Sequence, residues 1–176
     1  MKKIQKIIYL LGLFVALSFF IFTLGFSTNW AVGQMLGDFF IKAQIANKDM
    51  FRWALGGLVL SGLCLVFRVH INTKFFLSNY ILSGLFVYYL VGSAFTTLKY
   101  MEPLKAMYLE LDEFWLTLIV AINYGKISTD IFDIGIMLSY LMFIQAGLII
   151  FMMIFKLVKR LKRAKAKRLM QAEVTA

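Results

Sequence analysis

The sequence has few of the residues that stabilise disulfide-rich domains or bind metals. Its 176 residues include one proline, one cysteine and one histidine, and charged residues make up only 16%. The single cysteine, Cys64, cannot form an internal disulfide, which excludes a disulfide-stapled fold. Because His70 is the one histidine and Cys64 is distant in sequence, the chain has too few ligands for a transition-metal site. We therefore predict no metal and no cofactor.

Catalytic and nucleotide-binding motifs are also missing. The sequence contains no P-loop, no dinucleotide-binding glycine motif, no zinc-protease His-Glu-x-x-His and no Gly-x-Ser-x-Gly. It carries no signature of a known family either. These absences favour a protein that is not an enzyme.

What the sequence does have is a large excess of apolar residues. They make up 61% of the chain, against roughly 45–50% in ordinary globular proteins. Four apolar runs approach the roughly 20 residues that a helix needs to cross a bilayer, and a backbone in lipid must be helical to satisfy its polar groups. We predict an all-α integral membrane protein, with a four-transmembrane-helix bundle in residues 1–157 and a basic helical tail in residues 158–176. The predicted spans are residues 7–26, 53–69, 75–98 and 134–157.

The basic residues predict how the spans are oriented. Eight of the 19 Lys and Arg residues lie between Lys156 and Arg168, and three more precede the first run. With both termini in the cytoplasm, 13 basic residues lie inside and six outside, as the positive-inside rule requires. The first run is about 20 residues long, which favours a retained span over a cleaved signal peptide. The Met-Lys-Lys start and the lack of glycosylation sequons favour a bacterial plasma (cytoplasmic) membrane.

Two segments on the predicted outer side are apolar but are not counted as spans. Residues 30–46 have apolar side chains at helical spacing, which predicts an amphipathic helix. Residues 114–122 are nine strongly hydrophobic residues beside Glu113. A fifth span there would bury carboxylates and would place the basic tail outside, so we interpret this segment as re-entrant or interfacial.

The basic tail is the clearest candidate interaction surface. Basic clusters beside a span attract anionic lipid, although such a cluster can also simply fix the orientation. The tail has no aromatic residue for base stacking, which disfavours nucleic acid. We predict contact with the anionic inner leaflet or with a partner through Lys159, Arg160, Lys162, Arg163, Lys165, Lys167 and Arg168.

Two weaker sets of candidate residues lie elsewhere. Glu110, Asp112 and Glu113 could form an acid/base set on a lipid-linked substrate, or could simply keep their segment out of the bilayer. Small residues at helical spacing predict close helix packing at Gly57, Ser61, Gly84 and Gly92. Polar residues within the spans could hydrogen-bond across the bundle or line a path: Asn79, Ser83, Ser139 and Gln145.

Three functions are compatible with these patterns. No charged residue lies in the middle of a span, which disfavours a self-sufficient ion-coupled transporter. We expect a non-enzymatic accessory, assembly or regulatory subunit that packs against other membrane subunits or against itself. The alternatives are a small oligomeric channel or transporter component, and a membrane enzyme that uses the outer carboxylates.

Overall fold

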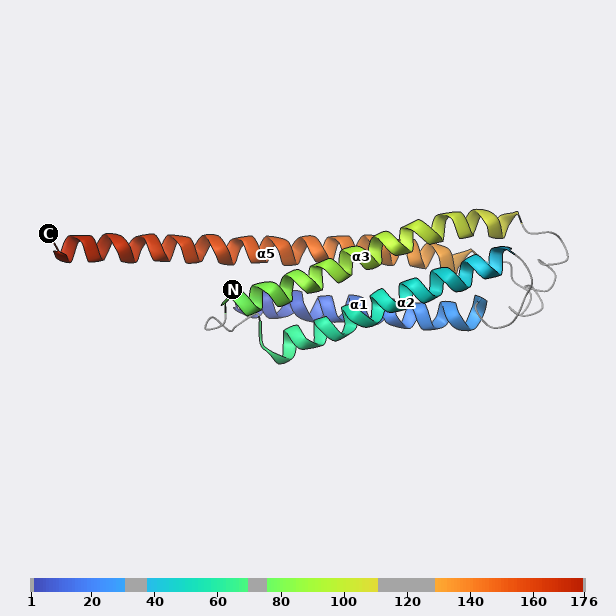
Figure 1. Ribbon diagram of the computed structural model, residues 1–176, viewed down its shortest axis with the longest axis horizontal. Coiled ribbons are helices and arrows are strands. Elements are labelled where there is room, and N and C mark those ends of the chain that lie inside the picture. Colours follow the sequence, from blue (N-terminus) through green and yellow to red (C-terminus); the bar gives the residue numbers. More distant parts are fainter. Residues whose placement is uncertain (1, 31–37, 70–75, 111–128, 176) are drawn as a thin grey trace.

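Every secondary-structure element in the described part of the chain is an α-helix (Figure 1). The computed structural model describes residues 2–30, 38–69, 76–110 and 129–175. Each of its four helices is long and apolar enough to cross a membrane, which confirms the predicted all-α fold with four candidate spans. In chain order the helices are α1 Lys2–Trp30, α2 Asp38–Val66, α3 Phe76–Leu109 and α5 Asp130–Thr175.

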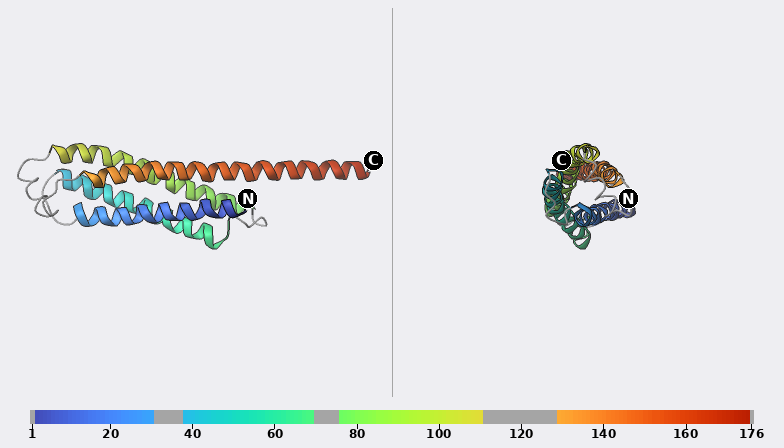
Figure 2. Two further views of the ribbon diagram at one scale, coloured as in Figure 1. Left: turned by 180° about the vertical axis from the view of Figure 1, so that it is seen from behind. Right: turned by 90° about the vertical axis from the view of Figure 1, so that its right-hand side faces the viewer.

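The helices form a bundle in which each one packs against two others. Both α1 and α3 pack against α2 and α5, and the end-on view shows the four arranged around a common core (Figure 2). Successive helices run in opposite directions, so α1 and α3 begin where α2 ends (Figure 1). We call this the tail end, because α5 continues beyond it as residues 158–175. The opposite end is the loop end.

Two helices are longer at the loop end than the hydropathy runs predicted. α2 begins at Asp38, so residues 38–46 are its first turns, and the prediction of a separate interfacial helix there is wrong. α3 continues to Leu109, well past the predicted end of its span at Leu98. Both extensions contain charged residues that lower the local hydropathy, but their apolar faces are buried against the bundle.

The rest of the predicted outer segments lies outside the described residues. This applies to residues 31–37, which follow α1, and to the segment 114–122, which was interpreted as re-entrant or interfacial.

An aromatic cluster at the loop end explains why the extensions are helical. Buried rings from all four helices meet there, including Phe26 of α1, Phe39 of α2, Tyr108 of α3 and Phe132 of α5. The ring centroids of Phe39 and Tyr108 are 5.9 Å apart, those of Tyr108 and Phe132 5.6 Å, and those of Phe26 and Phe132 6.4 Å. Aromatic pairs at this separation contribute about 0.5–1.5 kcal/mol beyond their area burial. The first turns of α2 are therefore held by protein contacts.

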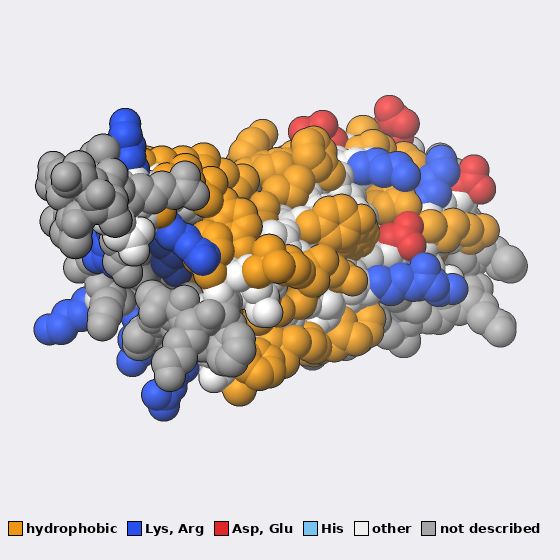
Figure 3. Space-filling model, turned by 60° about the vertical axis from the view of Figure 1, so that its left-hand side comes forward, with side chains coloured by type: hydrophobic (Ala, Val, Ile, Leu, Met, Phe, Trp, Pro, Cys, Tyr) orange, Lys and Arg blue, Asp and Glu red, His pale blue; other side chains and the backbone are white. Residues whose placement is uncertain are grey.

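The outer surface of the bundle is apolar around its middle and charged at both ends. Figure 3 shows a hydrophobic band between a tail end carrying Lys and Arg and a loop end carrying both signs. Within the band, Phe14 and Phe151 are 67% and 71% exposed. Exposing apolar surface to water is unfavourable by about 25 cal/mol per Å², so this band suits contact with lipid.

Candidate functional site

Four polar side chains meet inside the bundle near its tail end, one from each helix. They are Tyr9 of α1, Cys64 of α2, Ser83 of α3 and Lys156 of α5, and we call them the tail-end cluster. Tyr9, Cys64 and Ser83 are buried, and Lys156 is half-buried. Because the cluster joins all four helices, it fixes their relative positions along the bundle axis.

The hydrogen bonds of Ser83 and Tyr9 form a short chain. The Ser83 hydroxyl donates to the carbonyl of Asn79 over 2.8 Å, within its own helix. The Tyr9 hydroxyl lies 2.5 Å from Ser83 Oγ. Because Ser83 has one proton and gives it to Asn79, Tyr9 is the donor in this contact. This bond links α1 to α3 across the bundle.

The amine of Lys156 binds the end of α2. Its Nζ donates to the carbonyl of Val69 over 3.2 Å and lies 5.9 Å from the centroid of the Tyr9 ring. Val69 follows the last turn of α2, and the negative end of the helix dipole lies nearby, so an ammonium group here is favourable. Beside it, the Cys64 thiol donates a weak bond to the Leu82 carbonyl, with Sγ and O 3.8 Å apart.

The chain leaves α2 through a Schellman motif that presents the Val69 carbonyl. The amide of Val69 donates to the Cys64 carbonyl over 3.0 Å, and the amide of Arg68 donates to the Leu65 carbonyl over 3.0 Å. Arg68 has a φ of 49°, the left-handed conformation that glycine usually occupies in this motif. Val69 and Cys64 are both buried, which supplies the hydrophobic contact that accompanies the motif.

A second interhelical bond lies deeper in the bundle, between α1 and α5. The side-chain amide of Gln145 donates to the backbone carbonyl of Ile8 over 2.7 Å. Gly12, one turn further along α1, makes room for it: a Cβ at this position would lie 3.0 Å from Gln145 Nε2 and 2.9 Å from a ring carbon of Phe86. A larger residue at Gly12 would therefore push Gln145 away from α1.

Other buried hydroxyl groups bond within their own helices. Ser139 donates to the Gly135 carbonyl over 2.9 Å, Thr97 to the Ser93 carbonyl over 2.8 Å, and Ser61 to the Leu58 carbonyl over 2.7 Å. Ser83, Ser139 and Gln145, which the sequence analysis placed on a possible path, therefore each donate a hydrogen bond to a backbone carbonyl inside the bundle. Asn79 is half-buried on α3.

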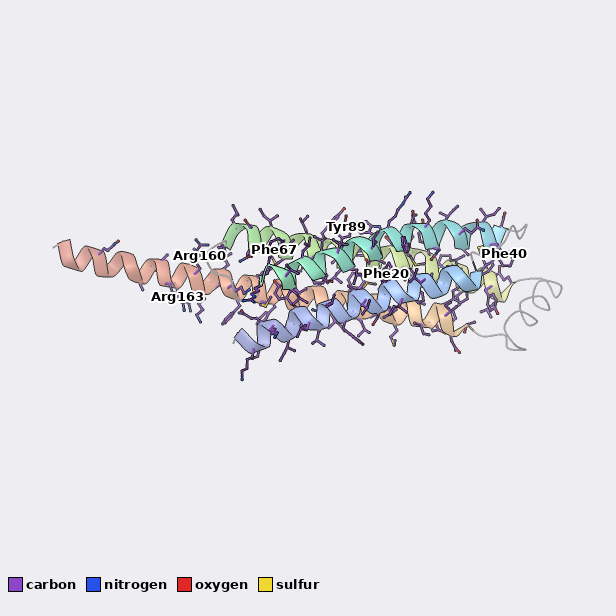
Figure 4. All side chains as sticks on the ribbon, turned by 90° about the horizontal axis from the view of Figure 1, so that it is seen from below. Phe20, Phe40, Phe67, Tyr89, Arg160 and Arg163 are labelled. Carbon is purple, nitrogen blue, oxygen red and sulfur yellow. The ribbon has the colours of Figure 1, made fainter. Side chains whose placement is uncertain are left out.

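Glycines allow α2 and α3 to approach each other closely. A Cβ at Gly92 would lie 2.3 Å from the Trp53 ring, and one at Gly56 would lie 2.0 Å from the Tyr89 ring (Figure 4). A Cβ at Gly57 would make an ordinary contact of 3.9 Å with Tyr89, and one at Gly84 would have nothing within 4 Å. Close packing is therefore concentrated at Gly56 and Gly92, of which the sequence analysis singled out only Gly92.

Polar contacts also join the helices at the loop end. The Tyr100 hydroxyl of α3 donates to Asp49 Oδ2 of α2 over 2.7 Å. Lys105 of α3 forms an ion pair with Asp133 of α5, with Nζ and Oδ1 2.6 Å apart. Of the predicted carboxylate set, Glu110 is exposed at the end of α3, and Asp112 and Glu113 lie outside the described residues.

The basic tail starts from a fixed point on the bundle. The guanidinium group of Arg160 lies 4.1 Å from the centroid of the Phe76 ring, at the beginning of α3, and Figure 4 shows Arg160 and Arg163 where α5 leaves the other helices. Lys159, Arg160, Lys162, Arg163 and Lys165 are all exposed. Lys167 and Arg168 belong to α5, but their side chains lie outside the described part.

The tail-end cluster was not predicted from the sequence. Each member is a polar residue in the tail-side half of its own apolar run, and that shared depth is the signal that could have found it. The cluster contains no carboxylate, and the described residues contain no group of three or more His, Cys, Asp or Glu side chains. Its chemistry is therefore that of a hydrogen-bonded junction between helices.

Comparison with known proteins gives no family assignment: no family model matches the chain, and neither a curated protein nor a solved structure matches it.

Proposed function

We propose that this protein is a non-enzymatic, multi-pass membrane protein that serves as an accessory, assembly or regulatory subunit of a larger membrane complex. The proposal places both ends of the chain on the cytoplasmic side of a bacterial plasma membrane. Its partners are then other membrane subunits, or further copies of the same chain, together with the anionic inner leaflet.

The observation that carries this proposal is how the polar groups are divided between the inside and the outside of the bundle. Inside, Tyr9, Ser83 and Gln145 are engaged in bonds that hold helices together. Outside, the surface between the charged ends is apolar, and α5 continues past the bundle as a basic helix. This division supports a protein that acts through its surface.

Charge supports the orientation. Among the described side chains, every Asp and Glu lies in the loop-end half of the bundle, whereas the tail end carries Lys and Arg. An excess of basic residues beside the spans marks the cytoplasmic side. A reporter enzyme that works only in the cytoplasm is therefore expected to be active when it is fused after residue 176. Activity of a fused reporter that works only in the periplasm would refute the orientation.

Purification in a mild detergent tests the subunit hypothesis. We expect an affinity-tagged chain to bring down another membrane protein in a fixed ratio, or to assemble with itself, and to do so equally well when Glu110 is changed to alanine. Recovery of the chain alone as a monomer would refute the hypothesis. The two alternatives, a channel component and an enzyme using the outer carboxylates, remain predictions that no contact among the described residues favours.

A further inference from the structure

The bond of Gln145 to the Ile8 carbonyl sets the register of α5 against α1. Lys156 is 11 residues further along α5, about 16 Å toward the tail, so its backbone lies near the start of α1 and its side chain reaches back to the Tyr9 ring. The amine of Lys156 lies against the Tyr9 ring and bonds to the Val69 carbonyl, so the end of α2 lies at this level as well. Lys3 and Lys6 lie in the first two turns of α1, close to this level. Arg68 lies next to Val69 in the chain. Basic residues of three helices therefore surround one layer.

The basic residues of α5 divide into two groups relative to this layer. Lys159 lies about 4.5 Å beyond Lys156 along the helix axis, and Arg163 about 10.5 Å, past the start of α1 (Figure 4). Lys165 lies about 13.5 Å beyond Lys156 and Arg168 about 18 Å, where α5 continues alone. Figure 1 shows the helix running straight on past the bundle. We call residues 159–163 the proximal segment and residues 165–168 the distal segment.

The proximal and distal segments lie at different heights above the hydrocarbon core of a bilayer. The polar headgroup region on each side of the hydrocarbon is about 5–8 Å thick. The apolar run of α5 ends at Leu157, so the proximal segment lies at headgroup level, within reach of its long side chains. The distal segment stands about one Debye length or more above the hydrocarbon edge, where the attraction of lipid charge is largely screened.

The proximal charges also require a counter-charge. Arg160 and Arg163 are three residues apart, a spacing at which like charges on a helix repel each other. No described acidic side chain lies at this end to offset them. The stacking of Arg160 on Phe76 and the bond of Lys156 to Val69 hold this part of α5 against the bundle, so the repulsion is not relieved by swinging the helix away.

We propose that the tail end is a binding surface for the phosphate groups of anionic phospholipids, and that the proximal segment binds them together with charges from α1 and α2. The distal segment takes no direct part. The residues of this binding surface are Lys3 and Lys6 on α1, Arg68 just past α2, and Lys159, Arg160, Lys162 and Arg163 on α5. Lipid is favoured over an acidic protein because the surface rings the bundle at the edge of its apolar band, where headgroups are already concentrated.

Two triple variants of the full chain test this assignment. K159Q/K162Q/R163Q and K165Q/K167Q/R168Q each replace two lysines and one arginine, so they change net charge and composition equally. The wild-type protein and both variants are reconstituted into nanodiscs of phosphatidylcholine and phosphatidylglycerol at a three-to-one ratio. After extraction, native mass spectrometry measures the ratio of the two lipids retained by each protein.

The wild-type protein is expected to retain phosphatidylglycerol in excess over its share of the bilayer. The proximal variant should lose at least about tenfold in this preference, since each charge near the surface changes lipid affinity by up to about fivefold, and the distal variant should keep it. Equal losses in both variants would overturn the proposal, because net charge alone would then explain retention. No loss in either would also overturn it and would leave the tail as a site for an acidic protein.

Circular dichroism checks that both variants are as helical as the wild type, which is expected because the replaced residues of the proximal segment are exposed. Nanodiscs present the same lipids on both faces. The inference rests on the proposed function only in taking anionic lipid as a partner. The result does not depend on which side of the membrane is cytoplasmic or on which complex the protein joins, so either of those can fail without it.

Discussion

The amine of Lys156 on α5 binds the carbonyl of Val69, which follows the last turn of α2, over 3.2 Å. These two residues are 87 positions apart in the chain, and their contact connects the helix that carries the basic tail to the short connection between α2 and α3. The tail therefore starts from a point that is fixed relative to the rest of the bundle.

Replacing this lysine with an apolar residue of similar length is expected to destabilise the bundle. In Lys156→Met the Val69 carbonyl loses its donor, which we expect to lower the free energy of unfolding by about 1–3 kcal/mol. Thermal unfolding in detergent, followed by circular dichroism, measures the change. Lys162→Met at an exposed position is the control and should leave Tm nearly unchanged; equal shifts in the two variants would show that the bond contributes nothing.

The glycines of α3 give a second prediction. Gly92→Ala places a methyl group against the Trp53 ring, which must shift. We therefore expect the free energy of unfolding to fall by about 1–3 kcal/mol. Gly84→Ala meets no atom within 4 Å and is expected to be neutral, or more stable by up to about 1 kcal/mol because alanine favours the helix. The comparison of their Tm values separates the two positions, and a larger loss at Gly84 would contradict the packing described for α2 and α3.

The left-handed residue that ends α2 gives a third prediction. A side chain in this conformation costs about 1–2 kcal/mol relative to glycine. Arg68→Gly removes that cost, whereas Arg68→Ala removes the same charge and keeps the cost. We therefore expect the glycine variant to unfold at a higher temperature than the alanine variant, and the opposite order would be inconsistent with the Schellman motif.

The bond between Gln145 and Ile8 gives a fourth prediction. Gln145→Leu keeps the volume of the side chain but removes the hydrogen bond between α5 and α1. We expect the free energy of unfolding to fall by about 0.6 kcal/mol, the usual value for such a bond, and by no more than about 1.7 kcal/mol. Ser139→Ala removes a hydroxyl that bonds only within α5 and should change stability less. Unfolding of both variants in the same detergent tests this, and an equal or larger effect at Ser139 would speak against the interhelical bond.

The existence of the four helices could be predicted because hydropathy acts locally. A run such as residues 134–157 is apolar over its whole length, and in lipid no other backbone structure satisfies its polar groups. Hydropathy did not join residues 38–46 and 99–109 to their spans, because Lys42, Lys99 and Lys105 lower the average; the apolar spacing of residues 30–46 predicted a helix but not its continuity with α2. These segments are helical because one face packs on the loop-end aromatic rings, and an average over a window does not resolve a face.

The sequence by itself determined the number of apolar helices, their order along the chain and the accumulation of positive charge in residues 156–168, because composition and period require no knowledge of neighbours. The tertiary structure alone decided the partners: that Lys156 meets Val69, that Tyr9 meets Ser83, that Gln145 reaches Ile8, and that Gly92 rather than Gly84 contacts another helix. Such contacts depend on the rotation of each helix about its axis and on its depth in the bundle. Both are set by the packing of all four helices together.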